Sequence, residues 1–236
     1  MRGRVSLAEF TPRHFVSRGA RDFRTEWLER EAASPGRVLN LGSKDLKMGT
    51  VRVDIDPAAS IHIRGDARNL PFKDNSFDAV IFSEVIEHLP AQSETRALSE
   101  VARVLAPKGR MILTTPASHP VYNILDLAWF LGHRHYRPST LRRLLEESGF
   151  RIDRIFRGGG PGDALRNLLY QLLLYPGLFR GRPAERFQRW IARFQDPITE
   201  QDSVRGFTIF VEARKSAGQA AGVRGARDAR PSSEGS

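Results

Sequence analysis

From residue 37 onward, short runs rich in β-branched and aromatic residues alternate with longer segments of helical periodicity. This alternation is typical of an α/β fold, because parallel strands need a crossover between them. The pattern predicts strands at 37–41, 51–55, 61–64, 77–83, 109–115, 151–157 and 206–213, and helices at about 91–106, 121–131 and 138–148. Seven strands with interleaved helices indicate a doubly wound, mostly parallel sheet.

Three segments of the sequence fall outside this alternating pattern: one before it, one within it and one after it. Residues 1–36 form an expected N-terminal helical cap, with Phe23, Trp27 and Leu28 at helical spacing. Within the main domain, 37–215, the long connection 158–205 is rich in apolar residues and arginine, so we expect an inserted helical lid or docking element. Residues 216–236 are rich in Gly, Ala, Arg and Ser and predict a disordered tail.

Composition narrows the class of protein. With 236 residues, 40% of them hydrophobic, the chain can bury one substantial core. The absence of cysteine excludes disulfides, thiolate metal sites and a cysteine nucleophile. No apolar run is long and unbroken enough for a signal peptide or a membrane span, so the expected location is cytoplasmic. The net charge of +10 is scattered without a nucleic-acid motif, so DNA is not an expected partner and RNA rests on charge alone.

Glycine or polar residues follow four successive predicted strands, where open α/β sheets bind their ligands. They are Gly42-Ser43, Asp54 with Asp56, Gly65-Asp66-Ala67, and Ser83-Glu84. Gly42 allows a ligand to approach the backbone, and the amides after it can donate hydrogen bonds. Asp54 can accept hydrogen bonds from a ribose diol, and Asp66, beside the Ala67 amide, can accept one from an exocyclic amine. Taken singly, each residue is equally consistent with an ordinary turn or cap.

Three longer motifs carry a resemblance to a known family. They are the run from Gly65 to Leu89, the run Leu98-Ser99-Glu100-Val101-Ala102-Arg103-Val104-Leu105-Ala106-Pro107-Lys108-Gly109-Arg110, and His135-Tyr136-Arg137-Pro138 with the segment up to Phe150. Together they resemble class I S-adenosylmethionine-dependent methyltransferases of the type 11 group. The likeness covers about residues 37–157 and the closing strand 206–213. It implies a Rossmann-like methyltransferase fold and S-adenosyl-L-methionine as the cofactor.

The resemblance also implies roles for particular residues. Asn40 would belong to the turn that touches the cofactor. Gly42 and Ser43 would line the methionine portion of the cofactor, and Asp54 would bind its ribose. The remaining cofactor contacts would come from Ile55, packed on the adenine, Asp66 and Ala67, at the adenine edge, and Ser83, which would close the site.

The first motif departs from the family pattern. Asn40 replaces an acidic residue, and Lys44 and Leu46 replace two glycines. Gly42 and Val51 also lie too close together for a crossover helix, which needs about a dozen residues. We therefore expect a short loop there; the third glycine, which serves helix-to-strand packing, is then unnecessary. Lys44 either contacts the cofactor carboxylate or points to solvent.

Methyl transfer from a sulfonium depends mainly on alignment, and a base is needed only for a hydroxyl or protonated amine acceptor. His88, just beyond the fourth predicted strand, is the best candidate base, although it could simply pack or cap there. The weaker candidates are His133, His135 and His119. Glu84, Glu87 and His88, completed by His133, have the spacing of a divalent metal site, but no metal is the expected state.

The sequence therefore predicts a methyltransferase that acts on a small-molecule or lipid-like acceptor held under the 158–205 insertion. Residues 164–190 suggest peripheral contact with an anionic membrane, with a dimer interface or core packing as the alternative. Two rival functions stay open: a non-catalytic binding or regulatory protein of the same fold, and an RNA methyltransferase.

Overall fold

The computed structural model describes residues 23–33, 36–43, 46–56, 61–126, 129, 132–173, 186–187, 190 and 206–216. Most of the predicted N-terminal cap, Lys44, most of the second half of the 158–205 insertion and the tail beyond Ser216 lie outside these residues. The described elements are α1 (Phe23–Ala32), β1 (Val38–Leu41), β2 (Val51–Asp54), β3 (Ile63–Arg64), β4 (Phe77–Ser83), the 3-10 helix η2 (Ile86–His88), α2 (Glu94–Val104), β5 (Leu105–Pro116), α3 (Pro120–Leu125), α5 (Pro138–Glu147), β6 (Phe150–Gly158), α6 (Pro161–Leu173) and β7 (Thr208–Lys215).

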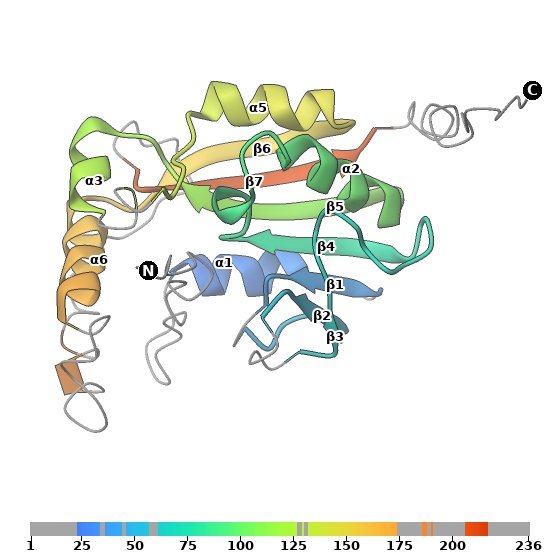
Figure 1. Ribbon diagram of the computed structural model, residues 1–236, viewed down its shortest axis with the longest axis horizontal. Coiled ribbons are helices and arrows are strands. Elements are labelled where there is room, and N and C mark those ends of the chain that lie inside the picture. Colours follow the sequence, from blue (N-terminus) through green and yellow to red (C-terminus); the bar gives the residue numbers. More distant parts are fainter. Residues whose placement is uncertain are drawn as a thin grey trace, which may run out of the picture.

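The strands form one seven-stranded sheet in the order β3-β2-β1-β4-β5-β7-β6 (Figure 1). Strand β1 pairs in parallel with both β2 and β4, and β4 pairs in parallel with β5. Only β7 runs against its neighbours, β5 and β6. The chain moves outward from β1 to β3 and then returns to the other side of β1, so a topological switch point lies between β1 and β4. The predicted doubly wound, mostly parallel sheet is confirmed.

Helices lie on both faces of the sheet, with α2 and α5 on one face and α1 on the other (Figure 1). The central strand β4 shows why, since Val80 and Phe82 point into the cluster under α2 and α5, while Ala79 and Ile81 point toward α1. Trp27 and Leu28 of α1 are each 1% exposed. Burying a side chain of this size stabilises the fold by about 1.5–3 kcal/mol. These two residues therefore hold α1 on its face of the sheet.

Several predicted boundaries differ from the structure: α2 spans Glu94–Val104 rather than 91–106, β3 spans Ile63–Arg64 rather than 61–64, and β7 spans Thr208–Lys215 rather than 206–213. Strand β5 begins at Leu105 rather than at residue 109, and its pairing with β4 is irregular between Phe77 and Ala79. Residues 106–109 therefore bulge from the ladder between β4 and β5. Helix α3 ends at Leu125 rather than near residue 131. No helix in the described part of the chain combines the length and apolar character that a bilayer crossing requires.

The connection from β1 to β2 contains no helix in its described residues, 42–43 and 46–50. Its apolar side chains Leu46 and Met48 pack on the cluster formed by Trp27 and Leu28 of α1. Asn40, itself 1% exposed, donates hydrogen bonds from Nδ2 to Leu46 O at 3.1 Å and to Met48 O at 3.4 Å. A carboxylate has no proton to donate to these carbonyls. The asparagine at the family's acidic position is thus explained by the short connection it holds.

We expect Asn40→Asp to destabilise the protein increasingly as the pH rises. Burial beside two carbonyl oxygens raises the pKa of the introduced carboxyl above its unfolded value near 4, so ionisation above that pH favours the unfolded state. Asn40→Ala is the control and should cost about 1–3 kcal/mol at every pH. Urea unfolding at pH 5 and pH 8 measures both. An Asn40→Asp variant that keeps the wild-type pH dependence would contradict this role of Asn40.

Candidate functional site

A cleft opens at the carboxyl ends of β1, β2 and β4, beside the topological switch point. This is the position where open α/β sheets bind ligands. Its walls come from the turn after β1, the end of β2, the segment after β3 and the segment that follows β4. The lining residues are Leu41, Gly42, Val53, Asp54, Ile55, Gly65, Asp66, Ala67, Arg68, Glu84, Val85, His88, Leu89 and Pro90.

Gly42 forms the sharp turn at the end of β1, with a φ of 67°. A Cβ atom on this residue would lie 2.3 Å from Cγ2 of Val85, so a side chain has neither the conformation nor the space it needs. Its N–H donates to Val53 O at 2.8 Å, and the Ser43 N–H points to the same oxygen at 3.4 Å. The turn therefore joins β1 to β2, and the Ser43 amide, one of those expected to face a ligand, points to this strand contact instead.

Ser43 lies directly after this turn and is 2% exposed. Within the described part of the chain, its hydroxyl oxygen has no hydrogen-bond partner. A buried hydroxyl without a partner is costly, by roughly 1–3 kcal/mol. Ser43 does not itself line the cleft, so a bound group would have to reach behind the β1 turn to satisfy this hydroxyl.

Asp54 and Ile55 stand together at the end of β2. Asp54 is 5% exposed, and its Oδ1 accepts a hydrogen bond from the Asp56 N–H at 2.9 Å, which fixes the carboxylate at the cleft wall. Ile55 is 61% exposed although it is a large apolar residue. An exposed apolar side chain next to a fixed carboxylate suits a ligand that has a flat ring beside a diol.

Asp66 forms an ion pair with Arg68, in which Arg68 Nη2 lies 2.6 Å from Asp66 Oδ2. The side-chain hydrogen bond from Arg68 lowers the pKa of Asp66, against the opposing effect of burial. The Arg68 N–H also donates to Asp66 Oδ1 at 2.8 Å. Asp66 therefore lies in the cleft as an oriented carboxylate, beside Ala67, as predicted. Arg68 is a cleft residue that sequence reasoning missed, because its pairing with Asp66 has no recognisable motif.

The side chains of Asn40 and Ser83 are engaged away from the cleft. Asn40 holds the connection between β1 and β2, as described above. Ser83 Oγ lies 2.7 Å from Thr114 Oγ1 on β5, a hydrogen bond that ties β4 to its neighbour. Neither residue is part of the cleft lining, so their expected roles toward a cofactor would act through the backbone they position.

Glu84 lies in the cleft in a conformation that L-residues rarely adopt, with a φ of 54°. Its carboxylate lies 3.4 Å from Arg24 Nη1 of α1, and Thr114 Oγ1 donates to Glu84 Oε1 at 3.0 Å. Helix α1 is thereby connected to the ligand cleft. The position of Glu84 at a strand end was visible in the sequence, but its contact with α1 was not, since that contact joins distant segments.

Of the four histidines considered as bases, His88 lines the cleft. Its ring meets the ring of His133 edge to face, with centroids 4.2 Å apart. His135 is buried, and both its ring nitrogens are engaged, with Asn123 Oδ1 at 2.8 Å and Asp126 Oδ2 at 3.0 Å. His119 is outside the cleft lining. The structure thus brings His88 and His133 together and gives His135 a packing role.

The divalent metal site considered from the sequence requires the side chains of Glu84, Glu87 and His88 to face a common point. Glu87 instead is 3% exposed, and Thr115 Oγ1 on β5 donates to its Oε2 at 3.1 Å. Among the residues that the structure describes, no three His, Asp or Glu side chains are arranged to hold a metal ion. Burial, and then the nearby charge of Glu84, raise the pKa of Glu87 well above its ordinary value.

The raised pKa of Glu87 predicts a pH-dependent contribution to stability. The folded state favours the protonated carboxyl, so stability falls as the pH rises above the unfolded value of 4.5 toward the folded one. Glu87→Gln removes this titration. Relative to wild type, we expect it to gain up to about 1.4 kcal/mol per pH unit in this window. Urea unfolding from pH 5 to 8 measures it, with the exposed Glu146→Gln as control; parallel curves for wild type and Glu87→Gln would rule this out.

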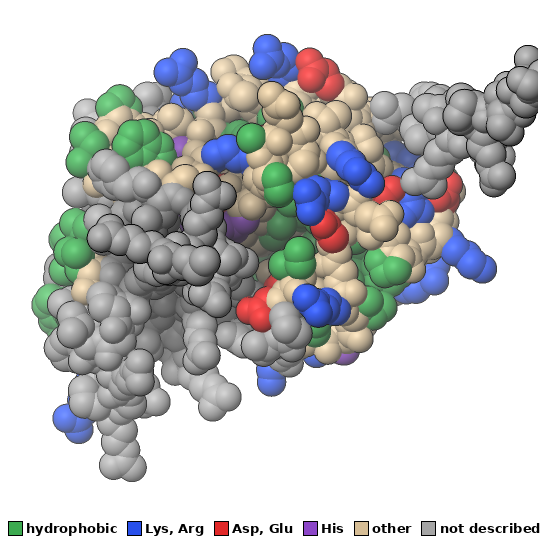
Figure 2. Space-filling model, viewed as in Figure 1, with side chains coloured by type: hydrophobic (Ala, Val, Ile, Leu, Met, Phe, Trp, Pro, Cys, Tyr) green, Lys and Arg blue, Asp and Glu red, His purple; other side chains and the backbone are tan. Residues whose placement is uncertain are grey.

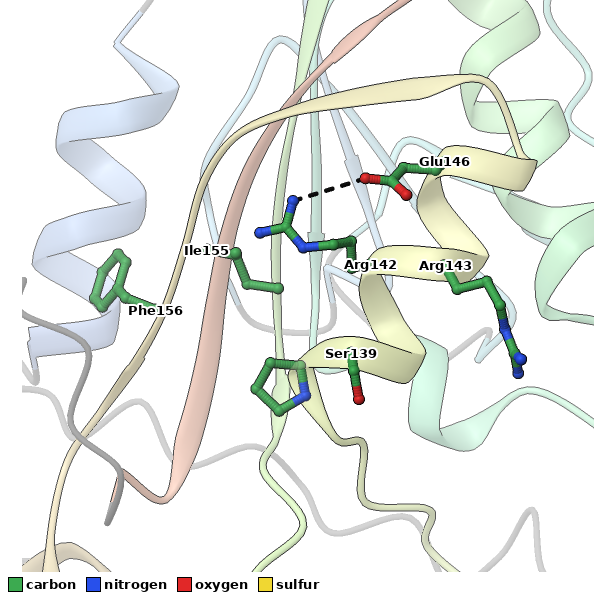
Figure 3. A pocket seen from close by; sticks show the side chains of 7 residues that line it. Ser139, Arg142, Arg143, Glu146, Ile155 and Phe156 are labelled. Atoms are coloured by element: carbon green, nitrogen blue, oxygen red, sulfur yellow. Dashed lines mark ion pairs between the residues drawn. The ribbon is translucent and has the colours of Figure 1, made fainter.

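A second hollow lies between α5 and β6 (Figure 3). It is larger than the cleft, at about 440 Å³ against 160 Å³. However, β6 is the edge strand, separated from β1 and β4 by β5 and β7. Figure 3 shows Arg142 turned toward Glu146 on the same helix, and both side chains are about half exposed, at 47% and 55%. The position of the smaller cleft at the strand ends therefore makes it the better candidate for the ligand site.

Comparisons with known proteins identify what the chain is similar to. Residues 26–113 match the methyltransferase domain family of type 11. The ubiquinone/menaquinone biosynthesis C-methyltransferase UbiE of Ruegeria sp. (strain TM1040) is 35% identical over 100 residues, which cover 42% of this chain and 39% of that protein. The chain thus spans well under two thirds of this relative.

Solved structures show the same fold at low sequence identity. A possible histamine N-methyltransferase of Thermotoga maritima superposes with a TM-score of 0.57 at 18% identity, covering 83% of this chain and 90% of that one. The [4+2]-cyclase SpnF superposes with a TM-score of 0.56 at 18% identity, covering 83% and 80%. Fold alone therefore does not fix the reaction. Residues 26–113 therefore form a methyltransferase domain of the type 11 family, and the sheet order agrees with that assignment.

Proposed function

We propose that this protein transfers a methyl group from S-adenosylmethionine to a small-molecule or lipid-like acceptor. The observation that carries the proposal is the composition of the cleft at the switch point. There the turn at Gly42, the carboxylates of Asp54 and Asp66, and the exposed Ile55 surround one space. These groups suit the three parts of an adenosyl cofactor: the methionine portion at the turn, the ribose at Asp54, and the adenine between Ile55 and the Asp66–Ala67 edge.

The charges of the cleft support a cationic nucleoside over a phosphorylated one. S-Adenosylmethionine carries a sulfonium, an ammonium and a carboxylate group, so its net charge is positive. The cleft presents the carboxylates of Asp54, Asp66 and Glu84, the last two paired with Arg68 and Arg24. Among the described residues that line the cleft, which do not include Lys44, Arg68 is the one arginine or lysine, and it is paired with Asp66. A phosphate group bound here would face carboxylates, and the cationic side chain of the described lining is already ion-paired, which is unfavourable. The buried Ser43 hydroxyl adds a donor for the methionine end.

The cofactor supplies an activated methyl group on sulfur, so the chain's own residues mainly orient and exclude water. Leu89 and Pro90 provide an apolar wall beyond the turn. His88 lies on the same wall, where its imidazole can accept the proton of an acceptor hydroxyl or amine. His133 packs against that ring and limits how it can turn.

Two observations support an apolar acceptor. The relative from Ruegeria is named for C-methylation in ubiquinone and menaquinone biosynthesis, which makes a hydroxylated quinol ring the acceptor to test first. Large apolar side chains are also exposed at the end of the molecule where α3 and α6 lie: Ile124, Trp129, Leu165 and Leu172 (Figure 2). We propose that residues 164–190 guide such an acceptor, or the membrane that holds it, to the cleft.

The rival functions make different demands. A non-catalytic binding or regulatory protein would retain the fold without methyl transfer, and the cyclase of similar fold shows that the fold permits this. An RNA methyltransferase would need a basic surface, and its support is the net charge of +10. The carboxylates in the cleft suit a methyltransferase of either acceptor class, so they argue against the non-catalytic rival and leave the acceptor to be tested.

Calorimetric titration with S-adenosylhomocysteine tests the cofactor role. Wild type should bind, and Asp54→Asn should weaken binding about tenfold or more, because a carboxylate acceptor for the ribose is lost. Asp56→Asn is the matched control, since Asp56 is two residues away and outside the cleft lining. Absence of binding at millimolar ligand, or equal losses in the two variants, would refute the assigned site.

Transfer of a labelled methyl group from S-adenosylmethionine then separates the proposed function from its rivals. The acceptors to compare are a short-chain demethylmenaquinol, a catechol and total transfer RNA. We expect methylation of the quinol. Cofactor binding without transfer to any small acceptor would favour the binding protein, and transfer to RNA alone would favour the RNA methyltransferase.

A further inference from the structure

The 3-10 helix η2 carries His88 into the cleft, but it is a single turn with little stability of its own. Its first residue is preceded by Val85, which makes no side-chain cap, and the His88 N–H donates to Val85 O at 3.0 Å. One-turn helices of this kind depend on outside contacts for a fixed geometry. The contacts that hold η2 therefore decide where the His88 ring lies.

Those contacts come from His133 to Tyr136, far along the chain. Arg134 lies 48 positions from Ile86 and donates from Nη2 to Ile86 O at 3.0 Å. The same nitrogen donates to Leu89 O. Arg134 Nη1 pairs with Glu94 at the start of α2. Since the two carbonyls stand on either side of His88, the guanidinium holds the backbone of the turn at both ends and ties it to α2.

Tyr136 strengthens the same arrangement. Its hydroxyl donates to Ile86 O at 3.2 Å, and the guanidinium carbon of Arg134 lies 5.9 Å from the centre of its ring. Burial raises the pKa of the Tyr136 hydroxyl, so it remains a donor at any physiological pH. Arg134 and Tyr136 therefore share one acceptor on η2.

The segment from His133 to Tyr136 is itself firmly anchored. The Tyr136 N–H donates to Pro116 O at 3.0 Å, and the Ser118 N–H donates to Tyr136 O at 2.7 Å, which joins the segment to the end of β5. His135 adds its two hydrogen bonds to Asn123 and Asp126. Arg134 thus links η2 to a segment that is hydrogen-bonded to the end of β5.

We propose that Arg134 is a positioning residue, which holds η2 so that the His88 ring faces the cleft against His133. This inference rests on the proposed function in assigning His88 as the base, but not in assigning Arg134 as its support. A lysine cannot replace it fully, because an ammonium group does not present a planar fork to two carbonyls and a carboxylate at once. Displacing His88 by about 1 Å is enough to reduce the transfer rate about 100-fold.

Imidazole NMR tests the inference without any enzyme assay. Nitrogen-15 spectra of histidine-labelled protein report each ring, and His88→Gln and His133→Gln assign the two signals. Arg134→Met should shift both signals, and Arg134→Lys should shift them less. Arg137→Met is the matched control, since Arg137 is exposed and three residues away. Unchanged His88 and His133 signals in Arg134→Met would overturn the inference; if that variant does not fold by circular dichroism, Arg134→Lys decides by the same criterion.

Kinetics with the acceptor that the transfer assay identifies add a second test. Arg134→Met should lower kcat about 100-fold while S-adenosylhomocysteine affinity changes less than about threefold. In a His88→Gln background the further effect of Arg134→Met should vanish, because positioning acts through the lost ring. A full additional loss in that background would overturn the inference. Should wild type bind no S-adenosylhomocysteine, the proposed function fails, while the imidazole spectra still decide the role of Arg134.

Discussion

The short connection between Leu41 and Val51 is the constraint on which the cleft depends. It leaves no room for a crossover helix, so the β1 end must turn sharply and pass directly to β2. Gly42 makes that turn against Val85, and the Gly42 amide bonds to Val53 O. Asn40 holds the far side of the connection, where Leu46 and Met48 take the place of helical side chains on the α1 face. These contacts put the turn and the Asp54 carboxylate on adjacent walls of one space.

The other half of the site is assembled from distant parts of the chain. Glu84 is linked to α1 through Arg24, and η2 is held by Arg134 and Tyr136. The proposed cofactor side thus depends on local turns at strand ends, whereas the proposed acceptor side depends on contacts between segments far apart in sequence. This division suits a fold in which the cofactor is shared and the acceptor varies.

The sequence predicts well the part of the site that is formed by turns at strand ends. It predicts poorly the part that depends on contacts between segments far apart in the chain. Strand β4 occupies its predicted residues, 77–83, because its apolar run is long and bounded by clear turn signals. Asp54, Ile55, Asp66 and Ala67 reach the cleft as predicted, since each follows a strand directly. Residue spacing does not encode side-chain partners. It therefore did not predict that Asn40 and Ser83 form hydrogen bonds away from the cleft, or that Arg68 and Arg134 form the contacts seen in the structure. His135 shows the same limit, because its two partners, Asn123 and the buried Asp126, lie on and just beyond α3.

The most direct measurement is a structure of the protein with S-adenosylhomocysteine bound. The account predicts that the ligand lies along the strand ends from Gly42 to Ala67, with its ribose hydroxyls in hydrogen-bond contact with Asp54 and its adenine on Ile55. A ligand bound in the hollow between α5 and β6, or a ribose that does not meet Asp54, would contradict it.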